Sequence, residues 1–294
     1  MNGIIIIDKP KGFTSQDVVS KVKKILNIKK AGHIGTLDPL AEGVLPVLLG
    51  EYTKLSKYLM EHDKTYIASL KLGKRTDTGD AEGVFIEEKE VPKEFFSEEK
   101  IREILERFKG KQIQTPPIYS AIKVEGKKLY EYARKGESVE IPKREIEIFD
   151  IDLLKIDIKE NEITFKVNCS KGTYIRSLCE DIAKKLNTVG YMSKLIRTVA
   201  GEFKIEEALT FDILENNKED RIFLEKKIIK MENMFSNHPK IVLNKRKEEL
   251  FLNGVMLTFE LKDGIYNVYT SEHKYIGLGV VKNMLLKRDV IIKE

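Results

Sequence analysis

Residues 31–46 read AGHIGTLDPLAEGVLP, and this stretch decides how the rest of the chain is interpreted. Gly32 to Gly43 contains three glycines and an Asp-Pro step, which predict an irregular loop rather than a regular element. Loops held by a rigid scaffold often carry the chemistry of a protein. Taken alone, however, Asp38-Pro39 is typical of an ordinary turn, so the surrounding sequence has to show whether Asp38 does more.

The segments on either side of this loop have clear periodicity. Ile4–Ile7 predicts a buried strand of β-branched residues, and Ser15 is expected to cap the helix that follows. That helix has an apolar stripe formed by Val18, Val19, Val22, Ile25 and Leu26. The sequence also predicts strands over Tyr66–Leu72 and Ile163–Cys169, and helices over Ser97–Phe108 and Ile175–Leu186. Because these strands and helices do not alternate regularly, they favour an α+β fold with a mixed sheet.

The chain of 294 residues, 41% of them hydrophobic, is long enough for one large domain and a small one. Ser236–Pro239 resembles a hinge, and short strand-like runs around Val242, Val268 and Val280 follow it. We therefore expect a larger domain over residues 1–235 and a compact β-rich domain over 236–294.

Several classes of protein are disfavoured by what the sequence lacks. No run approaches the roughly 20 apolar residues of a membrane helix, and Gly3–Ile7 is too short for a signal peptide, so a cytoplasmic protein is expected. Cys169 and Cys179 form neither a CxxC pair nor a zinc pattern and are expected to be buried thiols. The nucleotide-binding and zinc-protease motifs are also missing. We expect no cofactor and no metal.

The net charge of +5 is too small to identify a nucleic-acid-binding protein, but its distribution is informative. Lys109–Lys135 holds seven Lys or Arg against two Glu, and Tyr119, Tyr130 and Tyr132 lie among them. A solvated surface explains such a block as well. Cations interleaved with aromatic rings also suit a surface that meets phosphates and bases together.

The complete string in residues 31–46 resembles the catalytic-loop motif GH-x-G-x-LDP-x-A-x-GVLP of the TruB family of bacterial tRNA pseudouridine synthases. The resemblance extends over most of the chain. It covers residues 8–12 (DKPKG), 64–66 (KTY), 72–83 (LGKRTDTGDAEG), 114–123 (QTPPIYSAIK), 126–134 (GKKLYEYAR) and 169–176 (CSKGTYIR). Two positions depart from the family pattern. Glu42 stands where Thr or Ser is usual, and Ile196 precedes Arg197 where a second arginine is common.

This resemblance implies a role for each matching residue. Asp38 is the expected catalytic carboxylate, Arg176 its ion-pair partner, and Tyr66 the ring that stacks on the target uracil. The alternatives are a solvent-exposed Arg176 and a Tyr66 that only packs on a strand face. The substrate-binding residues implied by the resemblance are Lys9, His33, Tyr174, Leu195 and Arg197, together with Lys123, Lys127, Lys128 and Arg134 of a thumb insertion over residues 112–144. For His33, a purely structural histidine is the alternative.

The resemblance also implies a substrate and a mechanism. The expected reaction converts uridine 55 in the T loop of tRNA to pseudouridine, by base flipping and without a cofactor. The chain is expected to act as a monomer, without an obligate protein partner, gripping the T arm and touching the acceptor arm through a PUA-like C-terminal domain. A structural β appendage is the alternative for that domain. Two other functions stay open: a guide-dependent pseudouridine synthase of a ribonucleoprotein, and a tRNA-folding chaperone with secondary catalysis.

Overall fold

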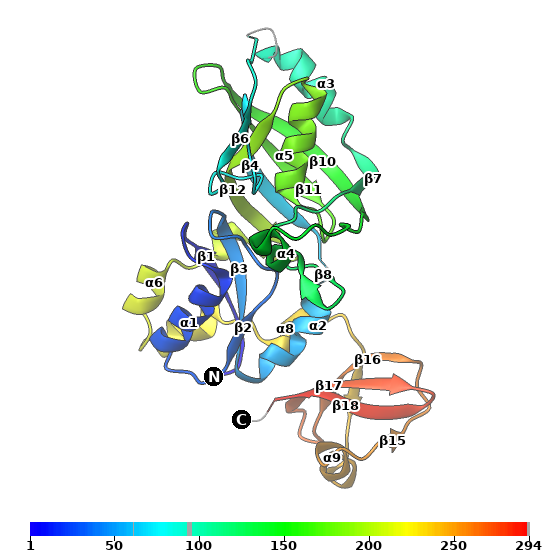
Figure 1. Ribbon diagram of the computed structural model, residues 1–294. Coiled ribbons are helices and arrows are strands. Elements are labelled where there is room, and N and C mark those ends of the chain that lie inside the picture. Colours follow the sequence, from blue (N-terminus) through cyan, green and yellow to red (C-terminus); the bar gives the residue numbers. More distant parts are fainter. Residues whose placement is uncertain (61, 93–95, 293–294) are drawn as a thin grey trace.

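The computed structural model describes residues 1–60, 62–92 and 96–292 (Figure 1). The strands of its main sheet are β1 (Gly3–Lys9), β2 (Ala31–His33), β3 (Glu42–Leu49), β4 (Lys64–Leu72), β7 (Gly110–Gln114), β10 (Arg144–Asp157), β11 (Glu162–Cys169), β12 (Gly190–Ala200) and β13 (Phe203–Lys204). Among the described residues these nine strands follow the order β1-β3-β12-β4-β11-β10-β7, with β2 beside β3 and β13 beside β12. Only the β3–β12 pair is parallel, so the predicted mixed sheet of an α+β fold is confirmed.

Helices cover the two halves of this sheet separately. Helix α1 (Ser15–Ile25) packs beside β1 and β2, whereas α3 (Glu98–Glu106) and α5 (Ile175–Lys185) cover β4, β10 and β12 (Figure 1). The remaining helical segments of this part are η1 (Gly50–Leu55), α2 (Ser56–Leu59), η3 (Ile205–Glu207), α6 (Phe211–Asn216), α7 (Arg221–Lys227) and α8 (Met231–Met234). None of the helices in the described residues is long and apolar enough to cross a membrane.

The apolar faces predicted from periodicity are buried in the core. Ile163, Phe165, Val167 and Cys169 of β11 are all 0% exposed, and the α1 stripe of Val18, Val19 and Val22 is buried as well. Burial of these side chains is the main favourable contribution to folding. Both cysteines are free and buried, as expected.

The predicted cap of α1 is wrong by one residue. Thr14 is the N-cap, and its hydroxyl accepts from the Asp17 backbone N–H in a capping box. Ser15 is instead turned inward, where its Oγ accepts from Leu37 N (2.9 Å) and donates to Leu37 O (3.0 Å). Two adjacent hydroxyl residues thus have different functions, one in the helix and one in the loop that contains Asp38.

The predicted irregular loop is shorter than Gly32–Gly43. Strand β2 extends through His33 and β3 begins at Glu42, because both ends pair along the sheet. The irregular part is therefore residues 34–41. We call these residues the aspartate loop.

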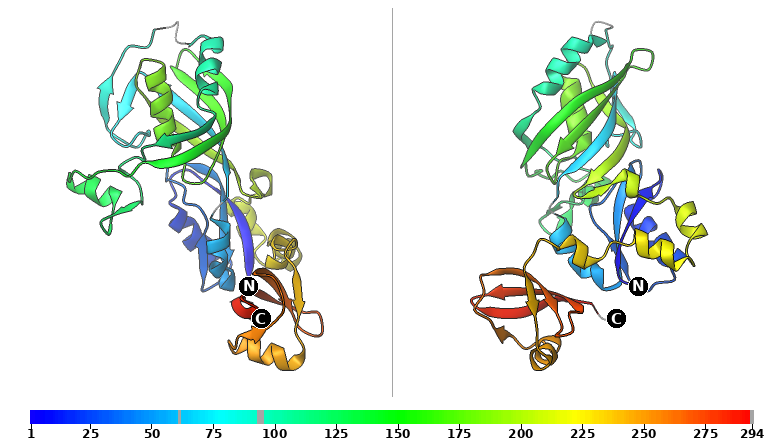
Figure 2. Two further views of the ribbon diagram at one scale, coloured as in Figure 1. Left: turned by 90° about the vertical axis from the view of Figure 1, so that its right-hand side faces the viewer. Right: turned by 180° about the vertical axis from the view of Figure 1, so that it is seen from behind.

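A hairpin and an insertion project from the main sheet. Strands β5 (Lys74–Thr76) and β6 (Phe85–Glu88) form the hairpin. Between β7 and β10 the chain leaves the sheet as β8 (Lys123–Val124), β9 (Lys127–Lys128) and α4 (Leu129–Lys135). This insertion, called the thumb below, stands away from the body in the left view of Figure 2.

Residues 240–291 form a second sheet with its own apolar cluster. Its elements are β14 (Lys240–Val242), α9 (Lys245–Leu252), β15 (Leu257–Thr258), β16 (Gly264–Tyr269), β17 (Tyr275–Lys282) and β18 (Leu285–Ile291). The strand order is β14-β16-β17-β18-β15, and Asp289 of β18 binds Lys57 and Tyr58 of the larger part. The predicted strands are present, but α9 was not foreseen. The boundary at residue 236 stays a prediction, and residues 293 and 294 of that domain lie outside the described residues.

The different tasks of Thr14 and Ser15 can be tested by replacing each with alanine. Thr14→Ala should lower the free energy of unfolding by about 1 kcal/mol and speed hydrogen exchange at the Asp17 amide. Ser15→Ala should cost about 1–3 kcal/mol, because it leaves both backbone groups of buried Leu37 without that partner, and should speed exchange at the Leu37 amide. Denaturant unfolding and amide exchange by NMR measure both effects. Unchanged exchange at Leu37 in Ser15→Ala would contradict this assignment.

Candidate active site

The aspartate loop is fixed from behind by three side chains. Ser15 holds Leu37, the residue before Asp38, as described above. The Lys9 ammonium donates to the carbonyls of Phe13 (2.6 Å), Pro10 (3.1 Å) and Pro39 (3.2 Å). Arg197 donates to the carbonyls of Val44 (2.8 Å) and Gly35 (2.9 Å). The backbone on both sides of Asp38 therefore has a fixed position.

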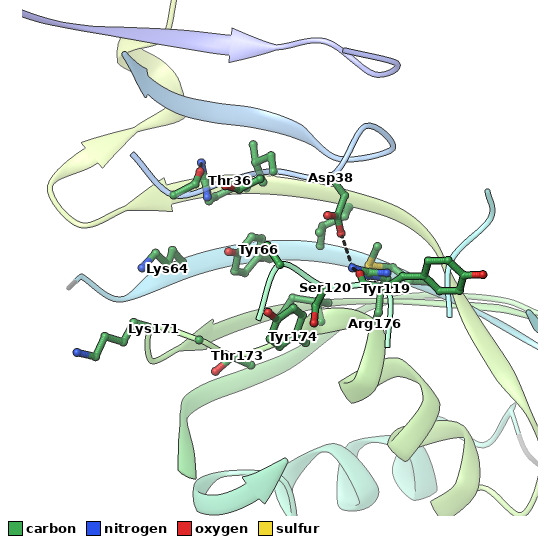
Figure 3. Close-up of a pocket in the computed structure, with 18 of the residues that line it drawn as sticks. Thr36, Asp38, Lys64, Tyr66, Tyr119, Ser120, Lys171, Thr173, Tyr174 and Arg176 are labelled. Atoms are coloured by element: carbon green, nitrogen blue, oxygen red, sulfur yellow. Dashed lines mark hydrogen bonds and ion pairs between the residues drawn. The ribbon is translucent and has the colours of Figure 1, made fainter. Parts of the chain in front are cut away.

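Asp38 forms an ion pair with Arg176, the second residue of α5. Arg176 Nη2 lies 3.1 Å from Asp38 Oδ2, and the side chains are 7% and 39% exposed (Figure 3). The cation is thus buried, while the carboxylate keeps a face open to the neighbouring cavity. The buried guanidinium contacts one carboxylate oxygen directly and fixes the direction of the carboxylate. The pairing predicted for Asp38 and Arg176 is present in the structure.

A second carboxylate, which the sequence analysis did not single out, lies on the other side of Arg176. Asp80 Oδ2 is 3.6 Å from Arg176 Nη1, and Asp80 is 4% exposed. Its Oδ1 accepts from Thr78 Oγ1 (2.7 Å) and from the Glu82 backbone N–H (3.1 Å). Asp80 lies in the stretch 72–83 that resembles the family, and this position was the only sequence signal that could have found it.

The cavity beside Asp38 has a volume of about 440 Å³ and is lined from several elements. Tyr66 of β4 and Leu195 of β12 form its sheet-side wall, and Tyr174, the N-cap of α5, lines it from the helix side (Figure 3). Tyr119 and Tyr130 of the thumb also line it. Burial raises the pKa of Tyr66, so its hydroxyl is neutral at physiological pH. One cavity is therefore lined both by the residues predicted to be catalytic and by those predicted to form its wall: Asp38, Arg176, Tyr66, Tyr174 and Leu195.

Lys9 and His33 do not line this cavity. Lys9 is 0% exposed and its ammonium is directed at backbone carbonyls, so in this structure it supports the aspartate loop. His33 lies on β2, half-buried, and its Nδ1 has no hydrogen-bond partner within the described part of the chain. Burial, with a smaller contribution from Arg197, lowers the pKa of His33 and keeps the imidazole neutral.

Arg197 lines the cavity but is not free to bind a substrate phosphate. It is 1% exposed, and its guanidinium is engaged with the two carbonyls named above. It is also the register partner of Tyr66 across β4 and β12. Its position supports the loop and the tyrosine.

The four predicted cations of the thumb lie away from Asp38. Lys123, Lys127 and Lys128 are on β8 and β9, and Arg134 is on α4. Lys128 Nζ and the Arg134 guanidinium lie 5.3 and 5.2 Å from the centre of the Tyr130 ring, within cation–π range. Because Tyr130 lines the cavity, the basic thumb surface continues to the cavity mouth.

Within the described residues no group of three or more His, Cys, Asp or Glu side chains is arranged to hold a metal ion. Burial raises the pKa of the Cys169 thiol to about 12, so it is an inert neutral group.

Residues 23–175 match the family model described as "TruB family pseudouridylate synthase (N terminal domain)", and residues 176–236 match the "tRNA pseudouridylate synthase B C-terminal domain". The chain belongs to the TruB family of pseudouridylate synthases. The tRNA pseudouridine synthase B of Caldanaerobacter subterraneus is 43% identical over 96% of both chains, and that of Clostridium tetani is 46% identical over 95% of both.

Solved structures show the same architecture. The archaeal box H/ACA Nop10–Cbf5 complex contains a chain that is 28% identical, with a TM-score of 0.67 over 99% of this chain and 85% of that one. An H/ACA ribonucleoprotein bound to a substrate RNA containing 2′-deoxyuridine gives 28% identity and a TM-score of 0.68, with the same coverage. The fold of this chain is therefore shared with protein chains found in H/ACA ribonucleoprotein structures.

The Arg176 guanidinium should not tolerate replacement by lysine. It donates to Thr78 O (3.1 Å) and Tyr119 O (2.9 Å) as well as contacting both carboxylates, and an ammonium cannot reach four acceptors in this geometry. We expect Arg176→Lys to slow single-turnover pseudouridine formation at least about a hundredfold. Arg75→Lys, which changes the more exposed Arg75–Glu87 pair, is the matched control and should stay near the wild-type rate. A near-wild-type rate in Arg176→Lys would remove Arg176 from the catalytic group.

Proposed function

We propose that this chain isomerises uridine 55 in the T loop of tRNA to pseudouridine, with Asp38 as the catalytic carboxylate and without a cofactor. The observation that carries this proposal is the Asp38–Arg176 pair, with Asp38 facing a cavity walled by Tyr66, Tyr174 and Leu195. Relatives that match nearly the whole chain bear the name tRNA pseudouridine synthase B. We further propose that the protein acts as a monomer in the cytoplasm.

The reaction requires a carboxylate and an enclosure. The bond from uracil N1 to ribose C1′ breaks, the base turns, and C5 bonds to C1′. Substrate and product are isomers, so the reaction needs no electron carrier. Asp38 can serve as a nucleophile at C6 or C1′ or as a base, and each route uses the carboxylate that Arg176 orients. The cavity retains the detached uracil while it turns.

The target uracil enters the cavity by base flipping. A stacked base must leave the T loop, at a cost of a few kcal/mol, before it can enter. In this proposal Tyr66 stacks on the flipped uracil, Tyr174 borders the nucleotide and Leu195 gives an apolar wall. His33 enters the T loop from β2, where its neutral imidazole suits contact with bases. Lys9 and Arg197 act indirectly, by holding the aspartate loop.

The thumb distinguishes this proposal from a guide-dependent enzyme. Its basic residues Lys123, Lys127, Lys128 and Arg134 can bind phosphates of the T arm without a guide RNA. The two solved structures mentioned above are named as H/ACA ribonucleoproteins, so pseudouridine formation by the lone protein on bare tRNA is the deciding observation. A tRNA-folding role beside catalysis is compatible with the same contacts.

For the C-terminal sheet we propose a PUA-like domain over residues 236–294 that contacts the acceptor arm. A cavity of about 740 Å³ lies between this sheet and η1, and its lining includes the cations Lys54, Lys274 and Arg288 beside the carboxylates of Glu248 and Asp289. These cations suit a nucleic-acid backbone. Asp289, bound to Lys57 and Tyr58, fixes the sheet beside the larger domain.

The target base is tested with unmodified tRNA and purified protein. We expect pseudouridine at position 55, mapped by carbodiimide-dependent primer extension, in full-length tRNA and in an isolated T-arm hairpin. Cytidine at position 55 should abolish product, and added salt should weaken binding to all tRNAs together. Asp38→Asn should bind tRNA within about tenfold of wild type but form no product. Modification confined to the anticodon arm, or dependence on a guide RNA, would overturn the proposed target.

The acceptor-arm contact is tested in the full-length chain by Lys274→Glu. This reversal should weaken binding of full-length tRNA several-fold, because it replaces one of the three cations that line the cavity with a negative charge, and leave binding of the T-arm hairpin unchanged. Lys262→Glu is the control, since Lys262 is an exposed cation between β15 and β16 that does not line the cavity. If both RNAs lose affinity equally, or neither does, this cavity is not the acceptor-arm site.

A further inference from the structure

The two residues at the base of the thumb are paired with each other. Gln114 is the last residue of β7 and Arg144 the first residue of β10, and they are register partners in the sheet. The thumb therefore leaves and rejoins the main sheet at a single point. Gln114 is only 3% exposed, which is unusual for an amide side chain at the edge of an insertion.

Both residues hold Tyr174. The Gln114 amide forms two hydrogen bonds with the backbone of Tyr174: its Oε1 accepts from Tyr174 N (2.8 Å) and its Nε2 donates to Tyr174 O (3.1 Å). The Arg144 guanidinium lies 5.6 Å from the centre of the Tyr174 ring. One residue thus fixes the backbone of this pocket-lining tyrosine, and its register partner covers the ring.

The next contacts along the thumb hold the first turn of α5. Ser177 Oγ donates to Thr115 O (2.9 Å), and Arg176 Nη2 donates to Tyr119 O (2.9 Å). The same Nη2 atom contacts Asp38 Oδ2 at 3.1 Å. The chain that enters the thumb is therefore hydrogen-bonded at Gln114, Thr115 and Tyr119 to the segment 174–177 that contains Tyr174 and Arg176.

We propose that Gln114 and Arg144 are positioning residues, which hold Tyr174 and Arg176 in the geometry that catalysis needs and connect this geometry to the position of the thumb. The inference rests on the proposed role of the thumb in gripping RNA. The RNA that the thumb holds and the Asp38 carboxylate that acts on it are then positioned by the same set of contacts. The Tyr174 carbonyl also accepts from Leu178 N (3.1 Å) within α5, whereas the Tyr174 N–H donates to the Gln114 amide.

The positioning role makes a different prediction from a purely structural one. If Gln114 only stabilised the fold, its loss would reduce the folded fraction and leave the rate of the folded enzyme unchanged. If it positions Tyr174 and Arg176, the rate at saturating tRNA should fall while tRNA affinity is kept, because the phosphate-binding cations of the thumb are untouched.

The experiment uses the full-length protein and unmodified tRNA. We expect Gln114→Ala to lower the saturated single-turnover rate at least about tenfold, and to change the Kd, measured in an Asp38→Asn background, less than about threefold. Gln114→Glu keeps the acceptor for Tyr174 N but loses the donor to Tyr174 O. Its rate should therefore lie between the rates of wild type and Gln114→Ala. Thermal unfolding gives the folded fraction of each variant.

Two further variants serve as controls. Glu145→Ala changes the next residue of β10, whose exposed side chain makes only a 4.0 Å contact with Lys111, and should match wild type. The double replacement Lys127→Ala and Lys128→Ala should weaken tRNA binding, which Gln114→Ala should not.

A wild-type rate in folded Gln114→Ala, or a loss confined to Kd, would overturn the proposal. If Gln114→Ala does not fold, Arg144→Met decides: it removes the guanidinium above Tyr174 and should slow the saturated rate several-fold, and an unchanged rate counts against the proposal. Absence of pseudouridine with the wild-type protein would instead count against the proposed function.

Discussion

The buried guanidinium of Arg176 is the interaction on which the site depends. A cation removed from water is costly unless charges and hydrogen bonds replace its hydration. Here two carboxylates, Asp38 and Asp80, and the carbonyls of Thr78 and Tyr119 surround it. These groups come from the aspartate loop, the turn after β5, and the thumb. Satisfying one cation therefore forces three distant segments of the chain together, and the cavity forms where they meet.

The aspartate loop is fixed by the same requirement, that buried polar groups must be hydrogen-bonded. An irregular loop has backbone N–H and C=O groups that form no regular strand or helix hydrogen bonds, and each of them needs another partner. Ser15, Lys9 and Arg197 supply partners for Leu37, Pro39, Gly35 and Val44. Two of these three side chains are charged and almost fully buried, which is tolerated only because their hydrogen bonds are made. The loop can thus hold Asp38 rigidly without being a regular element.

The sequence predicted what periodicity and the motif specify, and missed what depends on side-chain direction. The buried face of β11 and the helix before Leu186 followed from the spacing of apolar residues, and the pairing of Asp38 with Arg176 followed from the family resemblance. Asp80 was missed because a carboxylate in a turn normally faces water, and only the folded structure places it against Arg176. Lys9 was expected to contact substrate, yet its side chain turns inward. Likewise, which of Thr14 and Ser15 caps α1 depends on the entry angle of the chain, which the sequence does not specify.

The two departures from the family pattern are register partners, since Glu42 of β3 pairs with Ile196 of β12. The family pattern has Thr or Ser at position 42 and commonly arginine at position 196. Compared with that pattern, both changes make the charge at this strand pair more negative. Burial lowers the pKa of the Lys9 ammonium, and Glu42 is the largest influence that opposes this effect, followed by Asp38. The negative charge of Glu42 therefore helps to keep Lys9 protonated, and a protonated Lys9 has three donors for its three carbonyls. In this chain Glu42 therefore stabilises the support of the aspartate loop. The opposing strand position at Ile196 carries no charge, so it does not offset the negative charge of Glu42.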